Sequence, residues 1–562
     1  MKKMKKFLAM ALAVVMVLGM SVTALADEPA KPETKSATIT VKGTGTYTNN
    51  EGEEVAAADV FYLQIIKPDQ TTETGWSFVN DTIKNAYLAG YNQGKTPALS
   101  DQGVIQELID ARKASADGYA NSAEIGRALS KVAALNDFTK MEYKDIADGT
   151  TAACVDVTSA GVYAIKAAQT GYTYNTMAAY VGFGKANDGT YPVLVDATLI
   201  AKKSKIDLDK SHDDTDKVSA IGQIVNYTIE TYVPFIDPAK ENKTYFIYDE
   251  ITGADYVLNE KETAVVGTVK MADATSNEAG SDVPNAIIVP TTPNKEAEHA
   301  FYIDLCDLIN DENSNAGKKI TVTYSAKVTA VNVDNTAKAG HKTGETYGGE
   351  FGEDDEDVYT GKITLTKTGE ADDEKLANAG FEVTDESNSI VYFTKDGDGV
   401  YSHVETGDIP ENIKAALDDA ADAKSVDMTE LEQTGSDGKI YVRQVFTKDS
   451  DDPEEKGTVV VQGLNVGTYN FTEKTAPEGY SVNETPAKAT LVITKENGGE
   501  EASDGTLVAT KNIEASTGMS DTRLSALPST GGIGTTIFTI GGCVIMIVAA
   551  GLFFASRRKK DK

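Results

Sequence analysis

Short runs of alternating apolar and polar residues, separated by Gly, Asp and Asn turns, recur along most of this chain. Runs such as residues 224–233 and 320–331 are rich in β-branched and aromatic residues, which favour strands. Many short strands between tight turns are typical of domains built from two packed sheets. We therefore predict a mainly β protein of tandem immunoglobulin-like β-sandwich domains in an elongated array.

Two segments show helical spacing instead. Residues 97–134 carry apolar side chains at intervals of three and four, as at Ile105, Leu108 and Ile109. Residues 413–423 are rich in alanine and follow Pro410, which favours a helix start. We expect both segments to be helical insertions on the β scaffolds.

The first 26 residues have the pattern of a secretory signal peptide. Four lysines precede an apolar run that is too short to span a bilayer, and Ala24-Leu25-Ala26 follows as a small-residue cleavage site. We predict a cleaved signal peptide over residues 1–26 and a mature start at Asp27.

The other end carries a more specific pattern over residues 527–562. An apolar stretch over residues 533–556 is long enough to cross a membrane, and a basic tail, Arg557-Arg558-Lys559-Lys560, follows it. The residues before that stretch are Leu527, Pro528, Ser529, Thr530 and Gly531. Together these features resemble the sorting signal of sortase substrates. The resemblance implies that a sortase cysteine attacks the Thr530 carbonyl and that the acyl-enzyme then waits for an amine.

Composition excludes several classes of function. The net charge of −33 repels nucleic acid, so we expect no nucleic-acid partner. Cys154 and Cys306 lie in different predicted domains, which argues against a disulfide framework. The four histidines are scattered singly, without metal-ligand spacing. With no catalytic constellation in the sequence, we predict a protein that is not an enzyme and that holds no cofactor or metal.

Charged linkers suggest the domain boundaries. A lysine-rich segment begins at Lys202, and an acidic run occupies residues 353–357. These linkers predict three domains and a polar stem before the sorting signal, at residues 37–201, 202–358, 359–514 and 515–526.

The third domain resembles the collagen-adhesin B-type repeat of sortase-assembled pilins. The similarity lies in a first strand ending in Lys367, an "E-box" segment over residues 463–480 that contains Glu473, and the closing residues 509–513. It implies a self-formed isopeptide bond from Lys367 to Asn512, promoted by Glu473. The chemistry requires burial, which drives a lysine toward the neutral, nucleophilic amine and keeps a carboxyl group protonated.

The middle domain is similar to the fimbrial isopeptide domain of the same proteins. By motif, Lys210 corresponds to the amine and Asp249 to the acid. Where the family shows a Gly-Asn-x-Asn segment, this chain has Ala339-Gly340-His341-Lys342. The acceptor therefore departs from the pattern, with Asn335 and Asn332 as the nearby alternatives.

The first domain resembles the N-terminal pilin domain through residues 40–42 and 60–66, and we infer no bond in it. In the family, a lysine at the end of this domain joins the next subunit. Here the apolar strand over residues 194–201 leads into Lys202 and Lys203, but the family's Pro-Lys-Asn is absent. Lys202 is the expected polymerising lysine and Lys203 the alternate.

Taken together, these resemblances imply the shaft-forming subunit of a covalent pilus at the cell wall, held briefly in the membrane by its C-terminal span. The implied partners are a pilus-specific and a housekeeping sortase, other copies of the chain, accessory pilins and peptidoglycan. The alternative is a monomeric wall-anchored adhesin, or an accessory basal pilin, that binds a host or matrix ligand.

Overall fold

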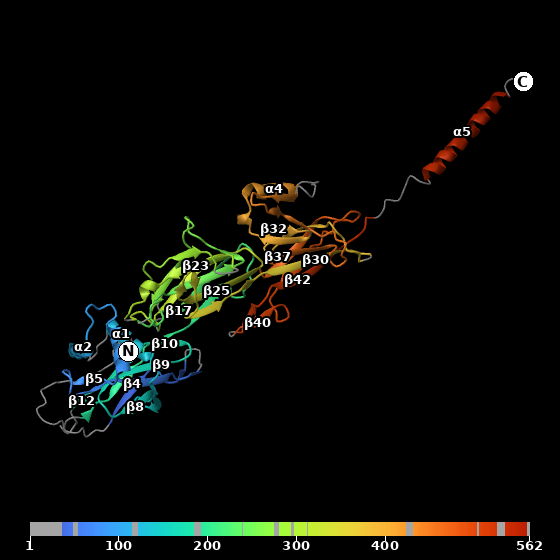
Figure 1. The fold of residues 1–562 in the computed structure, drawn as a ribbon. Coiled ribbons are helices and arrows are strands. Elements are labelled where there is room, and N and C mark those ends of the chain that lie inside the picture. Colours follow the sequence, from blue (N-terminus) through green and yellow to red (C-terminus); the bar gives the residue numbers. More distant parts are fainter. Residues whose placement is uncertain are drawn as a thin grey trace, which may run out of the picture. The chain divides into compact units, whose positions relative to one another are not determined.

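The computed structural model describes most of the chain from residue 36 to residue 558 (Figure 1). The described ranges are 36–48, 54–114, 122–184, 193–238, 240–274, 280–293, 297–311, 313–371, 373–422, 431–502, 505–524 and 534–558. The predicted signal peptide and residues 527–531 of the sorting signal lie outside them. The described chain is mainly β, as predicted, and forms two compact units. One unit comprises residues 1–215 and 224–358, and the other residues 216–223 and 359–562.

The first domain packs two sheets, β14-β1-β8-β7 and β11-β9-β4-β5, around one apolar core. That core runs from Ala37 to Ala201 and includes Ile39 and Ile165, which are fully buried on opposite sheets. The strands of this domain are β1 Ala37–Lys42, β2 Tyr47–Thr48, β3 Glu54–Val55, β4 Asp59–Pro68, β5 Trp76–Phe78, β6 Thr139–Lys140, β7 Glu142–Asp145, β8 Thr151–Val157, β9 Gly161–Ala168, β10 Tyr172–Tyr174, β11 Met177–Val181, β12 Phe183–Gly184, β13 Val193–Leu194, β14 Ala197–Ile200 and β15 Lys203–Lys205.

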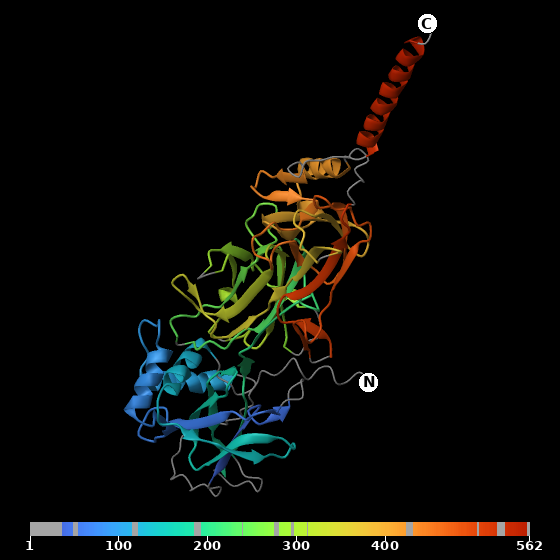
Figure 2. The ribbon, with the colours of Figure 1, turned by 90° about the vertical axis from the view of Figure 1, so that its right-hand side faces the viewer.

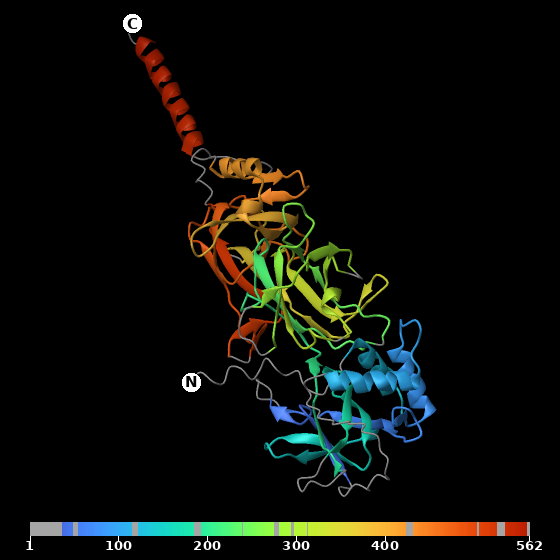
Figure 3. The same ribbon diagram turned by 90° about the vertical axis from the view of Figure 1, so that its left-hand side faces the viewer.

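Three helices are inserted between β5 and β6: α1 Asp81–Tyr91, α2 Asp101–Ala114 and α3 Ala123–Ala133 (Figure 3). The expected helical region is confirmed in α2 and α3. The helix α1 was not predicted from the sequence, although Asn80 caps it by accepting a hydrogen bond from the Ile83 amide. The inward faces of all three helices belong to the core of the domain, so the insertion is part of the fold.

The middle domain is a second sandwich, with sheets ordered β16-β17-β24-β20-β21 and β22-β23-β18-β25-β28. Its elements are β16 Leu208–His212, β17 Ile224–Tyr232, β18 Phe246–Thr252, β19 Ala254–Tyr256, β20 Gly267–Ala272, β21 Ser281–Asp282, β22 Ile288–Thr291, β23 His299–Asp304, η1 Cys306–Leu308, β24 Lys319–Val328, β25 Asn332–Gly340, β26 Lys342–Thr343, β27 Thr346–Tyr347, β28 Gly352–Asp355 and β29 Val358–Tyr359.

The third domain has a main sheet with the order β39-β38-β31-β32-β33-β37-β30-β42, to which β34, β35 and β36 add, and a separate two-stranded sheet of β40 and β41. The main sheet encloses the larger apolar core, and a smaller apolar cluster lies against α4. Its strands are β30 Gly361–Gly369, β31 Gly380–Thr384, β32 Ile390–Gly397, β33 Val400–Val404, β34 Glu432–Thr434, β35 Ile440–Val442, β36 Gln444–Phe446, β37 Thr458–Leu464, β38 Gly467–Thr475, β39 Ala487–Leu491, β40 Gly499–Glu501, β41 Leu507–Ala509 and β42 Ile513–Asp521. The short η2 Thr406–Asp408 precedes the expected helix, α4 Glu411–Asp422, which is labelled in Figure 1. Leu417 of this helix is fully buried.

The boundary predicted after residue 514 is wrong. The strand β42 pairs in parallel with β30 along its whole length, so most of the expected polar stem is the last strand of the third domain. Met519 is buried in the core of that domain, and backbone pairing continues to the isolated bridge between Tyr480 and Arg523. The domain therefore extends about as far as Leu524.

Two other predicted boundaries move. β15 pairs with β10 of the first domain, so that domain continues past residue 201 to Lys205. Residues 216–223, expected in the middle domain, pack in the unit of the third domain, where Val218 joins the core. The boundary predicted after residue 358 coincides with the division between the two units.

Beyond the β domains, α5 Gly534–Arg558 (red in Figure 2) covers the predicted apolar span. Within it, Ile537–Arg557 is long and apolar enough to cross a membrane, with a mean hydropathy of 2.5. This is the segment that the sorting-signal pattern requires.

Candidate cross-link sites

A lysine lies at the centre of the middle domain. Lys210 is on β16, where the alternation of buried and exposed residues turns its side chain inward, and that side chain is 0% exposed. Burial lowers the pKa of Lys210, because the charged ammonium loses its hydration. The rings of Tyr227 and Tyr324 lie 5.6 and 6.0 Å from the amine nitrogen. The amine is thus held in an apolar, aromatic setting.

Two predicted partners meet this amine from the facing sheet. Lys210 Nζ lies 2.5 Å from Asp249 Oδ2 on β18 and 2.6 Å from Asn335 Oδ1 on β25. Asp249 and Asn335 are both 0% exposed. The structure therefore brings together the amine, the acid and one of the two candidate acceptors in a single dry site.

Asn332, the other candidate acceptor, is exposed at the start of β25. The strand alternates, so Val333, Asn335 and Ala337 face the core while Asn332 and Asp334 face outward. Asn332 therefore points away from Lys210. This alternation was visible in the sequence and could have selected Asn335 directly.

Two tyrosines complete the site in the middle domain. Tyr324 Oη donates to Asp249 Oδ2 over 2.9 Å and accepts from Asn335 Nδ2 over 3.0 Å. Tyr256 Oη donates to Asp249 Oδ1 over 2.7 Å. Both oxygens of the acid are thus hydrogen-bonded by neutral donors. These two tyrosines were not predicted as site residues, because a tyrosine on a buried strand normally has only a packing role.

The third domain holds a second buried lysine. Lys367 is on β30, on the same inward face as Ile363 and Leu365, and its side chain is 0% exposed. Its Nζ contacts Asp521 Oδ1 and lies 3.0 Å from Glu473 Oε1. The Phe381 ring lies 5.7 Å from the amine. The predicted pair of Lys367 and Glu473 is thus brought together, with Asp521 as its third member.

Glu473 faces inward from β38, on the side of the strand that buries Tyr469 and Phe471. Burial raises the pKa of the Glu473 carboxyl, which favours the protonated acid. Its Oε2 accepts a hydrogen bond of 2.7 Å from the Asn483 amide, which fixes the group in place. Asp521 Oδ2 is buried with no hydrogen-bond partner in the described part of the chain, a costly state for an ionised carboxylate.

Asn512 is not the partner of Lys367. In the parallel register of β30 and β42, Lys367 lies beside Met519, while Asn512 precedes Ile513 at the opposite end of the ladder. At about 3.3 Å per residue, this places Asn512 roughly 20 Å along the strands from the amine. Its Oδ1 instead accepts a hydrogen bond of 3.0 Å from the Thr360 amide. The sequence-based assignment took the start of the last strand for its end.

Asp521 could have been found from the same alternation. Ile513, Met519 and Asp521 are separated by even numbers of residues and are all buried on β42. A carboxyl group on the inward face of a closing strand needs a buried cation or a reaction partner. Lys367 is the residue that meets this need.

Of the predicted polymerising lysines, Lys202 lies between β14 and β15, and Lys203 is the first residue of β15. Lys202 is half-buried, and burial lowers its pKa. Its backbone carbonyl accepts a hydrogen bond of 3.3 Å from the Asn175 amide. The Lys203 amine lies 4.5 Å from the centre of the Tyr172 ring.

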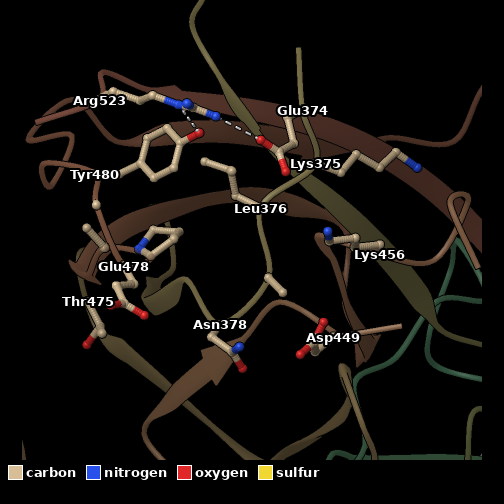
Figure 4. Close-up of a pocket in the computed structure, with 14 residues that line it drawn as sticks. Glu374, Lys375, Leu376, Asn378, Asp449, Lys456, Thr475, Glu478, Tyr480 and Arg523 are labelled. Carbon is tan, nitrogen blue, oxygen red and sulfur yellow. Dashed lines mark hydrogen bonds and ion pairs between the residues drawn. The ribbon is translucent and has the colours of Figure 1, made fainter. Parts of the chain in front are cut away.

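A groove of about 710 Å³ opens in the third domain where the chain leaves for the sorting signal (Figure 4). Arg523 Nε donates to Tyr480 Oη over 2.9 Å, and the same guanidinium pairs with Glu374 Oε2 over 3.0 Å. Leu524, the next residue, donates its amide to Gly479 O over 2.9 Å. The last described residues before the sorting signal are therefore held by hydrogen bonds and an ion pair to residues that line this groove.

Comparisons with known proteins agree with this architecture. Residues 361–505 match the model of the SpaA prealbumin-like fold domain, and residues 521–562 match the LPXTG cell wall anchor motif. The trypsin-resistant surface T6 protein of Streptococcus pyogenes serotype M6 is 24% identical over 431 residues, which cover 69% of this chain and 77% of that protein.

Two solved structures show similarity at low identity. The T6 backbone pilin of the same serotype is 16% identical with a TM-score of 0.45, covering 89% of this chain and 100% of that one. The major pilin SpaA of Corynebacterium diphtheriae is 12% identical with a TM-score of 0.36, covering 87% of this chain and 100% of that one.

The anchor motif and the prealbumin-like domain define a sortase substrate of the Gram-positive cell wall. Over a longer stretch the chain is similar in sequence to the T6 protein, a surface protein of Streptococcus pyogenes.

Proposed function

We propose that this chain is a pilin of the backbone type, a structural subunit of a cell-surface pilus. In the fibre it forms, internal isopeptide bonds cross-link the middle and third domains, and sortase joins Thr530 of one copy to Lys202 of the next. The observation that carries the proposal is the burial of two lysine amines, each against an acid and an acceptor. Leaving such groups unbonded in a dry core is costly, whereas an amide bond removes the buried charge.

In the middle domain, the Lys210 amine attacks Asn335 Cγ, and ammonia leaves. Asp249 takes up the proton that the amine releases and supplies one to the departing group, ending as it began. Each domain forms its cross-link once, within its own chain, and does not turn over. The chain is therefore not an enzyme.

In the third domain, the acceptor is a carboxyl group, so the leaving group is water. The neutral Lys367 amine attacks Cγ of the protonated Asp521 carboxyl. Glu473, whose raised pKa favours the acid form, donates a proton to the departing hydroxyl, which leaves as water, and takes up the proton that the amine releases. The unpartnered Asp521 Oδ2 is the oxygen that departs.

The positions of the two ties suggest a route for mechanical load. Lys210 lies at the start of the middle domain and Asn335 near its end, and the bond joins its two sheets. Lys367 and Asp521 lie on the first and last strands of the third domain, which are adjacent and parallel. Tension that enters at the start of either domain can leave near its end through one amide, bypassing residues 211–334 and 368–520.

The same route for mechanical load explains why the first domain needs no internal isopeptide bond. If the neighbouring copy is joined at Lys202, load passes from Lys202 through β15 into the middle domain. Residues 37–201 then lie off the loaded path and need no cross-link. The half-buried, pKa-lowered amine of Lys202 suits attack on an acyl-enzyme.

At the other end, Thr530 follows Arg523 by seven residues. A fully extended segment of that length spans at most about 25 Å. The Lys202 of the next copy must therefore lie within that distance of the groove around Arg523. A pilus-specific sortase would form these joints, and a housekeeping sortase would link the last copy to peptidoglycan.

The test is the state of the chain in cell-wall extracts boiled in detergent. The proposal predicts a ladder of high-mass species that contain this chain and a Thr530–Lys202 peptide in their digest. A single band at the mass of one subunit would contradict polymerisation and favour a monomeric adhesin.

A further inference from the structure

The hydroxyl of Tyr324 lies between the two groups that must exchange a proton in the middle domain. It is 2.9 Å from Asp249 Oδ2, the oxygen that also contacts the Lys210 amine at 2.5 Å. It is 3.0 Å from Asn335 Nδ2, the nitrogen that leaves as ammonia. The Lys210 amine itself lies against Asn335 Oδ1, at 2.6 Å, on the other side of the amide.

This arrangement poses a problem for direct transfer. Asp249 receives the proton at Oδ2 near the amine, while the proton is needed at Nδ2. No hydrogen bond joins Asp249 to Asn335 Nδ2 among the described residues, whereas Tyr324 bonds both. A hydroxyl can accept one proton while it gives up another, so it can connect the two groups.

We infer that Tyr324 is a catalytic residue that relays a proton from Asp249 to the leaving nitrogen of Asn335. The inference rests on the proposed Lys210–Asn335 cross-link. As Nζ bonds to Cγ, one amine proton passes to Asp249 Oδ2. Before the reaction Tyr324 donates to Oδ2 and accepts from Nδ2. The protonated Oδ2 becomes a donor, and Nδ2 gains a free lone pair in the tetrahedral intermediate, so both hydrogen bonds reverse. Tyr324 then gives its hydroxyl proton to Nδ2 and takes the proton from Oδ2, and the Cγ–Nδ2 bond breaks to release ammonia.

The surroundings of Tyr324 suit this role. The residue is 2% exposed, and the adjacent rings of Tyr227 and Phe301 lie 5.4 and 4.9 Å from its own. Burial, with the nearby Asp249 charge, raises the pKa of Tyr324 well above its ordinary value, so the hydroxyl is protonated at neutral pH. Tyr256 also donates to Asp249, but only to Oδ1, away from the exchanging oxygen.

The test follows bond formation in the full chain made by cell-free synthesis and quenched in acidic denaturant at intervals. Digestion and mass spectrometry give the fraction of the Lys210–Asn335 peptide at each time. Tyr324→Phe is expected to slow this linkage by about 100-fold, within the range of a lost general acid–base group. The Lys367–Asp521 peptide of the same molecules should form at its usual rate.

Tyr245→Phe is the matched control. Tyr245 is a fully buried tyrosine of the same domain whose hydroxyl donates to Tyr232 O over 3.2 Å and contacts neither Asp249 nor Asn335. This control should link at the wild-type rate. A wild-type rate in Tyr324→Phe would overturn the relay while leaving the cross-link in place. A wild-type chain without the Lys210–Asn335 peptide would instead overturn the proposed function.

Hydrogen exchange of the β17 and β24 amides shows whether Tyr324→Phe folds. If it does not, 3-fluorotyrosine placed at position 324 keeps the ring and its hydrogen bonds but makes the hydroxyl more acidic. The relay predicts faster linkage with this residue, since the proton is given up to nitrogen more readily. An unchanged or slower rate would overturn it.

Discussion

Lys367 and Asp521 meet in the core of the third domain, although 154 positions separate them in the chain. The meeting is set by the parallel pairing of the first and last strands, which places Gly369 beside Asp521. Both side chains face inward because each occupies a buried position in its strand's alternation. Strand register thus determines which residue can react with this lysine.

Glu473 should be required for the bond in the third domain. In Glu473→Ala, no acid remains to polarise the Asp521 carboxyl, so we expect the Lys367–Asp521 peptide to be absent. By loop-closure entropy, the lost tie should lower the free energy of unfolding by about 5 kcal/mol. Differential scanning calorimetry would detect the lower Tm.

The control for this variant is Glu478→Ala, which removes an exposed carboxyl from the groove five residues further along the chain. It should keep both the bond and the Tm. A linked peptide at wild-type abundance in Glu473→Ala would show that the acid is dispensable.

Lys202 should be the amine that joins the copies. Lys202→Ala is expected to abolish the high-mass ladder in wall extracts while leaving both internal bonds intact, since the lysine lies outside both sites. Lys203→Ala, whose side chain lies over Tyr172, should retain the ladder. The opposite pattern, with polymers in the Lys202 variant and none in the Lys203 variant, would move the joint by one residue.

The stability of an unlinked middle domain should depend on pH through Lys210. Asn335→Ala removes the acceptor but leaves the burial that lowers the Lys210 pKa below the ordinary 10.5. The unfolded chain then binds more protons than the folded one between the lowered pKa and about 10.5, so stability rises with pH across that window. The rise is at most about 1.4 kcal/mol per pH unit.

Hydrogen exchange of the β16 and β25 amides would measure this dependence. The matched control is the double variant Lys210→Met with Asn335→Ala, which lacks the titrating amine and should show a flat profile. A rise of equal size in the double variant would assign the effect to other groups.

The proposed path of mechanical load can be tested by stretching single molecules between Lys202 and Thr530 and measuring their extension. The linked chain should lengthen little before rupture, because residues 211–334 and 368–520 are bypassed. Asp521→Ala should release the segment from 367 to 521, adding roughly 500 Å at 3.3–3.6 Å per residue. An equal extension in the linked chain would contradict the tie in the third domain.

Much of this organisation could be predicted from sequence, because it depends on local patterns. Strand alternation gave the mainly β fold, and the motifs gave Lys210, Asp249, Lys367 and Glu473, which the structure brings to two sites. Short motifs of this kind contain their own strand periodicity. They therefore identify which side chains face the core.

The acceptors were harder to predict, because they depend on pairing between distant strands. Asn512 fitted the spacing of a closing motif. Alternation along β42 marks Asp521 as inward-facing, but only the register of β30 against β42 brings it to Lys367. Alternation along β25 likewise favours Asn335 over Asn332, but the sequence does not show that this face meets Lys210. Tyr324 joins the site through tertiary contacts alone, so no linear pattern could identify it.

The most direct test of the account is the mass of the full chain made in a host without sortase, followed by mapping of its cross-linked peptides. We predict a mass lower than that of the unlinked sequence by one water and one ammonia, with Lys367 joined to Asp521 and Lys210 to Asn335. In Asp521→Ala, the mass should be lower than that of its own unlinked sequence by one ammonia only. Asn512→Ala should keep both bonds. A wild-type mass equal to that of the unlinked sequence would contradict the central claim.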